Sequence, residues 1–158
     1  MEKPQIFIAN DHGGYTLKTN LVSYLLEKGY EVQNFGCDSE EIVRYPFYAA
    51  KVARAVLETE NSKGILLCST GIGMSIMANK FKGIRAALCY SSYQARMTAA
   101  HNNSNILCLG GRCIGSFEAM DMVNLWLETP YEGGRHDISL GLIAEAEVIQ
   151  FSKDWWEF

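Results

Sequence analysis

Short apolar runs recur along the chain and alternate with segments of helical periodicity, and this alternation constrains the fold more than any other feature. Five runs have the length and composition of β-strands: residues 5–9, 31–35, 64–68, 84–89 and 105–109. Several are continuously apolar, as expected for strands that are covered on both faces. Strands that alternate with helices favour a parallel sheet between two helical layers. The sequence therefore predicts an α/β fold, a three-layer α/β/α Rossmann-like sandwich with a five-stranded, mostly parallel sheet.

The segments between and after these strands repeat apolar residues on one helical face. Gly29 stands where a helix C-cap belongs, and Pro46 is tolerated in a first helical turn. No linker or repeat interrupts the pattern, so we predict one domain over residues 1–150 and an aromatic C-terminal extension over 151–158. The extension is expected to pack on the chain itself or on a neighbouring subunit. The predicted helical faces are Leu17, Leu21 and Leu25; Tyr48, Val52 and Val56; Phe117, Met120, Val123 and Leu127; and Leu140, Ala144 and Val148.

The composition is that of an ordinary globular protein, with 48% hydrophobic and 20% charged residues, which excludes disordered and collagen-like chains. No apolar run approaches the ~20 residues that a membrane helix requires. A net charge of −4 gives no sign of nucleic-acid binding. The first residues lead into a strand without the apolar stretch of a secretory signal. We therefore expect a cytoplasmic protein that contacts neither membrane nor nucleic acid.

The chain has five cysteines, an odd number, and no two are spaced as C-x-x-C: Cys37, Cys68, Cys89, Cys108 and Cys113. This spacing predicts neither a disulfide framework nor a zinc site. Most of the five are expected to be reduced packing residues, because a free cysteine behaves as a small buried hydrophobe. Cys68 is the exception, because of the loop in which it stands.

Open parallel sheets bind ligands at the carboxyl ends of their strands, so the loops that leave those ends are the candidates for chemistry. Asp11 and His12 follow the first predicted strand, and Arg112 follows the fifth. His101 follows the helix predicted after the fourth strand, and His136 stands in a later loop. All three histidines of the chain are thus expected in loops at the functional edge of the sheet.

The segment C-S-T-G-I-G-M-S, residues 68–75, directly follows the third predicted strand. Gly71 and Gly73 let backbone amides converge, and the next helix presents its positive N-terminus at the same corner. These features predict an anion-binding loop; the alternative is a plain turn between a strand and a helix. The segment lacks the lysine of a Walker loop and the arginine of a cysteine-phosphatase loop. A thiolate at Cys68, favoured by the helix end, could act there as a nucleophile or as a base.

Taken together, these motifs resemble those of the ribose-5-phosphate isomerase B family, which also contains the galactose-6-phosphate isomerase subunits. The similarity is carried by residues 64–75, 78–80 and 82–87, by D-H-G-G at 11–14, by H-N-N at 101–103 with L-G-G-R at 109–112, and by E-G-G-R-H at 132–136. The family divides by its catalytic base. Cysteine at 68 with methionine at 74 resembles the cysteine type rather than the glutamate type.

The resemblance implies an enzyme that interconverts ribose 5-phosphate and ribulose 5-phosphate, a step of the pentose phosphate pathway, through a cis-enediolate. Neither a cofactor nor a metal is implied. Cys68 would move the proton between C1 and C2, His101 would open the furanose ring, and Asp11 would orient the sugar hydroxyls. The Thr70 hydroxyl and the amides of residues 69–73 would hold the enediolate oxygens, in the manner of an oxyanion hole.

The resemblance also implies a set of substrate-binding residues and an assembly. His12, Arg112 and Arg135 would grip the phosphate. The assembly would be a homodimer with active sites at the interface, Cys68 coming from one chain and some of His101, Arg112 and Arg135 from the other, or a tetramer of such dimers. The full substrate-binding set is Asp11, His12, Ser69, Thr70, Gly71, Ile72, Gly73, Asn102, Arg112 and Arg135.

One departure from the family pattern bears on the substrate. Ser139 stands where the family commonly has a second phosphate arginine. A weaker or repositioned phosphate grip follows, which leaves open a six-carbon substrate, allose 6-phosphate or galactose 6-phosphate. A non-catalytic sugar-phosphate-binding module on the same fold is a further alternative. It is disfavoured because binding alone needs no proton-transfer residues.

Overall fold

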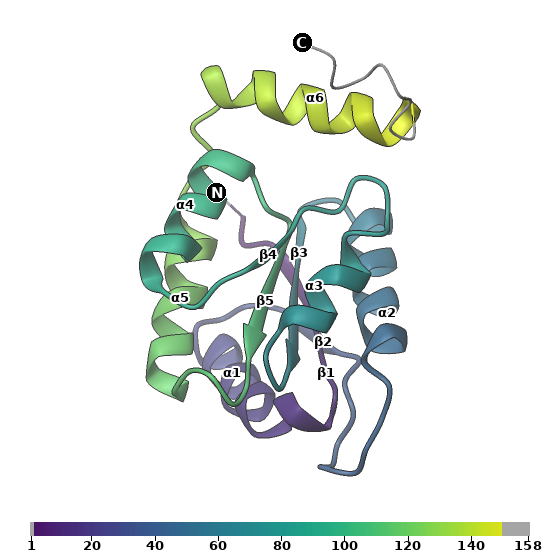
Figure 1. Cartoon of the computed structure of the whole chain (residues 1–158). Helices are drawn as coiled ribbons and strands as arrows, with labels where there is room; N and C mark the ends of the chain where they lie inside the picture. Colours follow the sequence, from purple (N-terminus) through teal and green to yellow (C-terminus); the bar gives the residue numbers. More distant parts are fainter. Residues whose placement is uncertain (1, 150–158) are drawn as a thin grey trace.

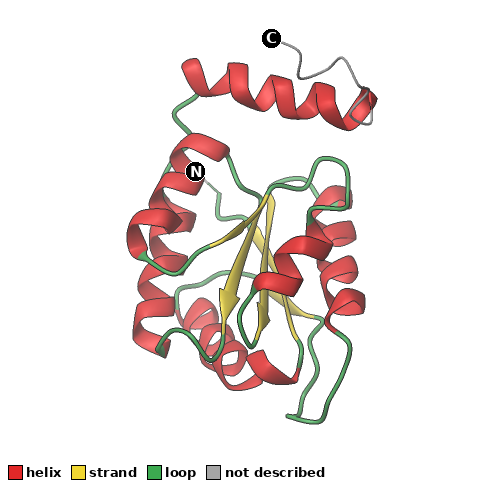
Figure 2. Cartoon of the chain, viewed as in Figure 1, coloured by secondary structure: helices red, strands yellow, loops and turns green. Residues whose placement is uncertain are grey.

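A single sheet forms the middle layer of the protein in a computed structural model that describes residues 2–149 (Figures 1 and 2). Its five strands are all parallel, in the order β2-β1-β3-β5-β4. The predicted α/β sandwich is confirmed, with a wholly parallel sheet. The predicted aromatic extension lies outside the described residues. The strands are β1 (Gln5–Asn10), β2 (Val32–Asn34), β3 (Ser62–Cys68), β4 (Ala86–Leu88) and β5 (Ile106–Gly110).

Helices cover both faces of the sheet (Figure 2). A separate apolar cluster fills the space beneath each helical layer. Helices α1 (Tyr15–Glu27), α4 (Ser92–Asn102) and α5 (Ser116–Glu128) lie on one face, while α2 (Tyr45–Glu58) and α3 (Ile72–Ala78) lie on the other. Within β1, Ile6 and Ile8 pack into the first cluster, and Phe7 and Ala9 into the second. Successive side chains alternate across a strand. Burial on both faces therefore explains why the strand sequences are continuously apolar.

Two helix boundaries form as the sequence predicts. The last turn of α1 is followed by Gly29 at φ +76°, a left-handed conformation that glycine adopts without a Cβ penalty. Pro46 lies in the first turn of α2, where a missing amide hydrogen costs no intrahelical bond.

The predicted core face of α5 is confirmed except at Phe117. Val123 is buried, and Met120 and Leu127 are partly buried and pack against the core, whereas Phe117 is 86% exposed. The core face also includes Trp126, which the helical pattern did not single out. Its buried indole donates to the Ser104 hydroxyl over 2.8 Å. The other buried residues of this helix are Ala119 and Met122.

The last helix, α6 (Arg135–Ile149), lies apart from the sheet across one end of the molecule (Figure 1). Its predicted core face of Leu140, Ala144 and Val148 is not buried, and only Ala146 of this helix is. Ile138, Leu142, Ile143 and Val148 are exposed instead. Exposed apolar patches of this kind are typical of interaction sites. No helix within residues 2–149 is long and apolar enough to cross a lipid bilayer.

Candidate active site

The carboxyl ends of β1, β3 and β5 meet at the point where the chain switches from one face of the sheet to the other. The helix after β1 lies on one face and the helix after β3 on the other, which opens a crevice between these neighbouring strand ends. Asn10 is paired with Leu67, and Cys68 with Gly110. The register therefore places Asp11, Cys68 and the loop after Gly110 side by side.

The loop after β3 wraps its backbone around the sulfur of Cys68. The amide of Gly71 donates to Cys68 Sγ over 3.0 Å, and a bond of this kind stabilises negative charge on the sulfur. Gly71 adopts φ +78°, and a Cβ there would lie 2.9 Å from the Leu109 carbonyl carbon. Only glycine allows this approach at low cost. Within residues 2–149, the amides of Ser69 and Thr70 have no protein acceptor, so they remain able to bind an anion.

Neighbouring segments hold this loop in place. The amides of Gly111 and Arg112 donate to the carbonyls of Cys68 and Ser69 over 2.8 and 3.1 Å. The Tyr90 hydroxyl donates to the Thr70 carbonyl over 2.7 Å. Burial and then the charges of Cys113 and Cys68 raise the pKa of Tyr90, which keeps this hydroxyl a donor. The loop is therefore braced on the side of β5 and on the side of the turn after β4.

Two tyrosines at this corner were missed by the sequence interpretation. Tyr90 is one of them. The other is Tyr45, the first residue of α2, whose ring lies so close to Gly73 that a Cβ there would be 2.8 Å from it. No motif signals either residue, because each reaches the loop from a distant part of the chain.

Asp11 and His12 stand directly at the end of β1. Asp11 is 5% exposed, and its Oδ1 accepts from the Gly13 amide over 2.8 Å. His12 Nδ1 accepts from the Val43 amide over 3.4 Å. In the neutral ring the proton then resides on Nε2, which is left as a donor. A Cβ at Gly13 would meet the Ser69 amide nitrogen at 2.7 Å, so glycine lets β1 and the Cys68 loop approach closely.

A cavity of about 220 Å³ opens beside His12. His12 and Arg112 supply its hydrogen-bond donors and positive charge, and Glu40 lies on its wall, where it accepts from the Thr16 hydroxyl over 3.4 Å. The cavity is suited to a small anion next to the Cys68 loop. The complete lining consists of His12, Gly13, Thr16, Glu40, Gly111 and Arg112.

The other thiols divide into core and surface residues, and all five are free. Burial raises the pKa of Cys89 to about 11 and raises the pKa of Cys108 well above its ordinary value, so both are neutral packing residues, as predicted. Cys113 is exposed and Cys37 half-buried, so the packing prediction is wrong for Cys113. Met74 is fully buried in the core and offers no titratable group.

The remaining predicted site residues lie at the opposite end of the sheet. His101 and Asn102 form the last turn of α4, and Arg135 begins α6. The Asn105 carbonyl just after α4 accepts from the amide of Gly64, which is four residues before Cys68 in β3. At 3.3 Å per residue, the part of β3 from Gly64 to Cys68 spans about 13 Å, and it separates the end of α4 from the Cys68 loop. The prediction that all three histidines lie in loops at one edge is therefore wrong: His12 is in a 3₁₀ turn, and His101 and His136 are in helical turns at the other end.

Three residues that were given no role in the predicted site organise this second corner: Arg85, Glu132 and His136. Arg85 Nε donates to the Asn102 carbonyl over 3.1 Å, and Arg85 Nη2 donates to the Asn103 carbonyl over 2.8 Å, which caps the C-terminus of α4. His136 stacks on His101 with ring centroids 4.2 Å apart, and Glu132 lies within 4 Å of both rings. The motif at 132–136 contains two of these residues, but only the fold brings them to the end of α4.

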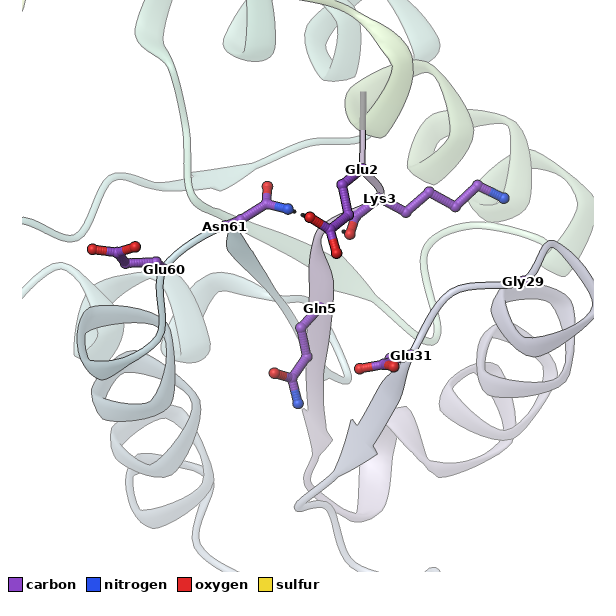
Figure 3. A pocket seen from close by; sticks show the side chains of 7 residues that line it. All are labelled: Glu2, Lys3, Gln5, Gly29, Glu31, Glu60 and Asn61. Atoms are coloured by element: carbon purple, nitrogen blue, oxygen red, sulfur yellow. Dashed lines mark hydrogen bonds between the residues drawn. The ribbon is translucent and has the colours of Figure 1, made fainter.

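A cavity of about 630 Å³ lies at the amino end of the sheet (Figure 3). Its charged side chains are Glu2, Glu31, Glu60 and Lys3. Carboxylates outnumber the single ammonium there, so the cavity is unsuited to a phosphate, and it contains no histidine or cysteine. The chemically equipped crevice is the one beside Cys68.

Comparison with known proteins agrees with this geometry. The family described as Ribose/Galactose Isomerase matches residues 6–143. Ribose-5-phosphate isomerase B of Escherichia coli is 45% identical over 87% of this chain and 92% of its own. The solved structure of Clostridium thermocellum ribose-5-phosphate isomerase B has a TM-score of 0.90 at 48% identity, over 94% of this chain and 99% of that one. The Mycoplasma genitalium enzyme, solved with bound ribulose 5-phosphate, has a TM-score of 0.88 at 35% identity over the same shares.

A family match over most of the chain, together with a relative of this identity and coverage, settles the family. The resemblance to the ribose-5-phosphate isomerase B family inferred from the motifs is confirmed. The chain belongs to the ribose/galactose isomerase family, on its ribose-5-phosphate isomerase B side.

Proposed function

We propose that this chain interconverts ribose 5-phosphate and ribulose 5-phosphate through a cis-enediolate. The observation that carries the proposal is the loop at the end of β3, where a thiol, a hydroxyl and open backbone amides share one crevice. Membership of the family supports the same activity, because relatives that match most of the chain are named ribose-5-phosphate isomerase B. The chain is accordingly an isomerase, and the pentose phosphate pathway is its proposed setting.

Cys68 is the proposed base. Its thiolate takes the proton from C2 of the open-chain aldose, the C1–C2 double bond forms, and the C1 carbonyl becomes an enediolate oxygen. The hydroxyl proton of O2 passes to O1, and the thiol returns its proton to C1, which gives the ketose. Only protons move, so the reaction as written uses neither a redox cofactor nor a metal. A positioned base of this kind must lie within reach of the proton it abstracts.

Thr70 and its neighbours are the proposed oxyanion hole. The Thr70 Oγ1 already accepts from the Ile72 amide over 3.3 Å, so its own proton is available to an enediolate oxygen. The amides of Ser69 and Thr70 donate to no protein acceptor within residues 2–149. Fixed donors of this type stabilise charge that develops in the transition state.

Asp11, His12 and Arg112 are the proposed contacts of the remaining substrate groups on the same chain. Asp11 Oδ1 is used by the Gly13 amide, so Oδ2 is left for a sugar hydroxyl. His12 and Arg112 line the small cavity, where the phosphate would sit.

A homodimer is the proposed assembly, because one chain does not bring the predicted site together. His101, Asn102 and Arg135 lie at the far end of the sheet from Cys68. A second copy, packed against the exposed apolar surface of α6, would supply these residues to the Cys68 crevice. His101 would then open the furanose ring, Asn102 would contact the sugar and Arg135 the phosphate. An interface of this kind should bury on the order of 1,000 Å² or more.

The cytoplasm is the proposed location. The five free thiols, including the buried Cys89 and Cys108, fit a reducing compartment.

An isomerisation assay of the purified protein on ribose 5-phosphate, allose 6-phosphate and galactose 6-phosphate tests the activity and the substrate together. We expect the highest kcat/KM for ribose 5-phosphate. A higher value for either hexose phosphate would establish the six-carbon alternative, which the serine at 139 leaves open. Binding of all three without turnover would instead identify a sugar-phosphate-binding module.

A further inference from the structure

Three metal-ligand side chains converge at the corner where α4 ends and α6 begins. His101 comes from the last turn of α4, Glu132 from the connecting loop and His136 from the first turn of α6. Glu132 Oε2 lies 3.7 Å from His101 Nε2 and 3.6 Å from His136 Nε2. The ligand atoms of all three residues lie within 4.8 Å of one another.

The backbone builds this corner independently of any ligand. Gly133 and Gly134 adopt φ +64° and +60°, which turns the chain sharply between Glu132 and His136. The Glu132 amide donates to the Ala100 carbonyl over 2.9 Å and so fixes the loop to the end of α4. The three ligands are thus held by two helix ends and a glycine turn rather than by a free surface loop.

The convergence of both rings on one carboxylate oxygen is the decisive feature. Both Nε2 atoms lie within 4 Å of Glu132 Oε2. The imidazoles are stacked, with centroids 4.2 Å apart and an interplanar angle of 14°, so one ring must tilt out of the stack for both nitrogen lone pairs to point at one ion. Ligands about 2.1 Å from a tetrahedral zinc ion are about 3.4 Å from each other. The observed separations of 3.7 and 3.6 Å need to close by only a few tenths of an ångström. We infer that His101, Glu132 and His136 form a reversible binding site for a divalent transition metal of the zinc class.

The ligand set selects the class of metal. Two imidazoles and one carboxylate suit Zn²⁺, whereas Mg²⁺ prefers oxygen ligands in octahedral geometry. The side chains of His101, His136 and Glu132 are 33%, 17% and 59% exposed, which leaves the fourth position open to solvent. The site therefore resembles an open zinc site with three protein ligands. It would bind the ion more weakly than a structural site with four protein ligands.

Metal binding here would inhibit the enzyme, a consequence that rests on the proposed function. The ion would occupy Nε2 of His101, the residue proposed to open the sugar ring. No covalent or redox step is involved, and removal of the ion restores the free imidazole. The site thus gives the proposed isomerase a sensitivity to zinc-class metals that is separate from the Cys68 thiol.

Titration calorimetry with Zn²⁺ on the full chain tests the site directly. The Cys68→Ser background removes the thiol that would otherwise compete for the metal. We expect one Zn²⁺ per chain and no Mg²⁺, and at least about tenfold weaker Zn²⁺ binding in both Glu132→Gln and His136→Gln. Even indirect partners of metal ligands usually contribute 10- to 100-fold, roughly, to affinity. Asp137→Asn is the matched control: this carboxylate lies in the same helical turn but pairs with the Tyr131 hydroxyl over 2.8 Å, and its loss should leave Zn²⁺ affinity unchanged.

Co²⁺ substitution provides a second readout that does not depend on the variants. The visible spectrum should show a nitrogen- and oxygen-ligated ion without a sulfur-to-metal charge-transfer band. Undiminished Zn²⁺ binding in both variants, or a charge-transfer band from cysteine, would overturn the assignment. Because binding is measured without substrate, the two proposals fail separately: an inactive protein that binds Zn²⁺ here contradicts the proposed function, and an active one that does not contradicts the metal site.

Discussion

The amide of Gly71 donates a hydrogen bond to the sulfur of Cys68 over 3.0 Å, across a turn that leaves the end of β3. The same turn carries the Thr70 hydroxyl and the amides of Ser69 and Thr70, which have no protein acceptor within residues 2–149. The proposed base and the proposed oxyanion hole therefore depend on a single backbone conformation. Changes to the thiol and changes to the turn can be separated by experiment.

Replacing Cys68 with serine should lower kcat by at least ~100-fold, the scale on which a positioned acid–base group contributes. KM should change little, because the hydroxyl keeps the shape of the crevice. Steady-state kinetics measure both values. Cys113→Ser is the matched control, since Cys113 is an exposed thiol at the same corner whose Sγ lies 3.6 Å from the Ser69 carbonyl oxygen. Near-normal turnover in Cys68→Ser would remove this residue from the mechanism.

Replacing Gly71 with alanine should damage both stability and activity. The residue adopts φ +78°, which costs an L-residue roughly 1–2 kcal/mol. The added Cβ would also press on the Leu109 carbonyl carbon at 2.9 Å. Urea unfolding should show a loss of at least ~1 kcal/mol, accompanied by a lower kcat.

Gly115→Ala is the control for this change. Gly115 has φ −76°, and no heavy atom lies within 4 Å of an added Cβ. The unfolding free energy of the Gly115→Ala protein should therefore stay within about 0.5 kcal/mol of the native value. If the two variants were equally stable and active, the turn at Gly71 would not be under the constraint described.

His101→Asn should separate ring opening from proton transfer. The variant should lose activity on cyclic ribose 5-phosphate but keep part of it on a four-carbon sugar phosphate that cannot close a furanose ring. Parallel kinetics on the two substrates give the ratio of the losses. Equal losses on both would mean that His101 does not act on the ring, and the proposed division between His101 and Cys68 would be abandoned.

Mixing Cys68→Ser with Arg135→Ala should restore activity if each site takes residues from two chains. Random exchange makes half of the dimers mixed, and one of the two sites in each mixed dimer is intact, so about one quarter of native activity is expected. Activity is measured before and after subunit exchange.

The matched control mixes Cys68→Ser with His12→Ala. Both residues lie at the same end of one chain, so every site in a mixed dimer keeps one defect and no recovery is expected. Recovery in both mixtures, or in neither despite proven exchange, would contradict the shared-site arrangement. A monomer in sedimentation would contradict the dimer itself.

Lys63 should make the stability of the protein rise with pH in the alkaline range. Its ammonium lies 4.5 Å from the Trp126 ring centroid and donates to the Ser104 carbonyl over 3.1 Å. Burial, and then the charge of Arg85, lowers the pKa of Lys63 from 10.5 to about 8. Between these two values the unfolded chain keeps a proton that the folded chain has released, so the unfolding free energy increases with pH.

Lys63→Met tests this relationship. Urea unfolding of the native chain and the variant, compared at several pH values from about 8 to 10.5, should show the native chain gaining stability relative to the variant. A difference that stayed constant across the range would show that Lys63 titrates as a free lysine does.

Sequence by itself determined the architecture, because alternation of buried strands with amphipathic helices leaves few ways to arrange a chain. The continuous apolar runs in β1 and β3 require cover on both faces, and the observed clusters beneath the two helical layers provide it. It also determined the candidate chemistry at the end of β3, because a cysteine followed by Gly71 and Gly73 is a local pattern. The residues that carried the family resemblance are all present at their expected positions in the chain.

Tertiary structure alone decided which of these residues meet. Along the chain, Cys68 and His101 both follow the sheet-forming segments, but α4 runs back against its strand and delivers His101 to the opposite end. The buried indole of Trp126 likewise meets the Ser104 hydroxyl, which is 22 residues away along the chain. His136 and Glu132 reach His101 only because Gly133 and Gly134 turn the chain at the start of α6. Hydrophobic periodicity indicates which face of a segment is buried. Contacts between segments depend instead on the direction and length of the helices and strands that separate them.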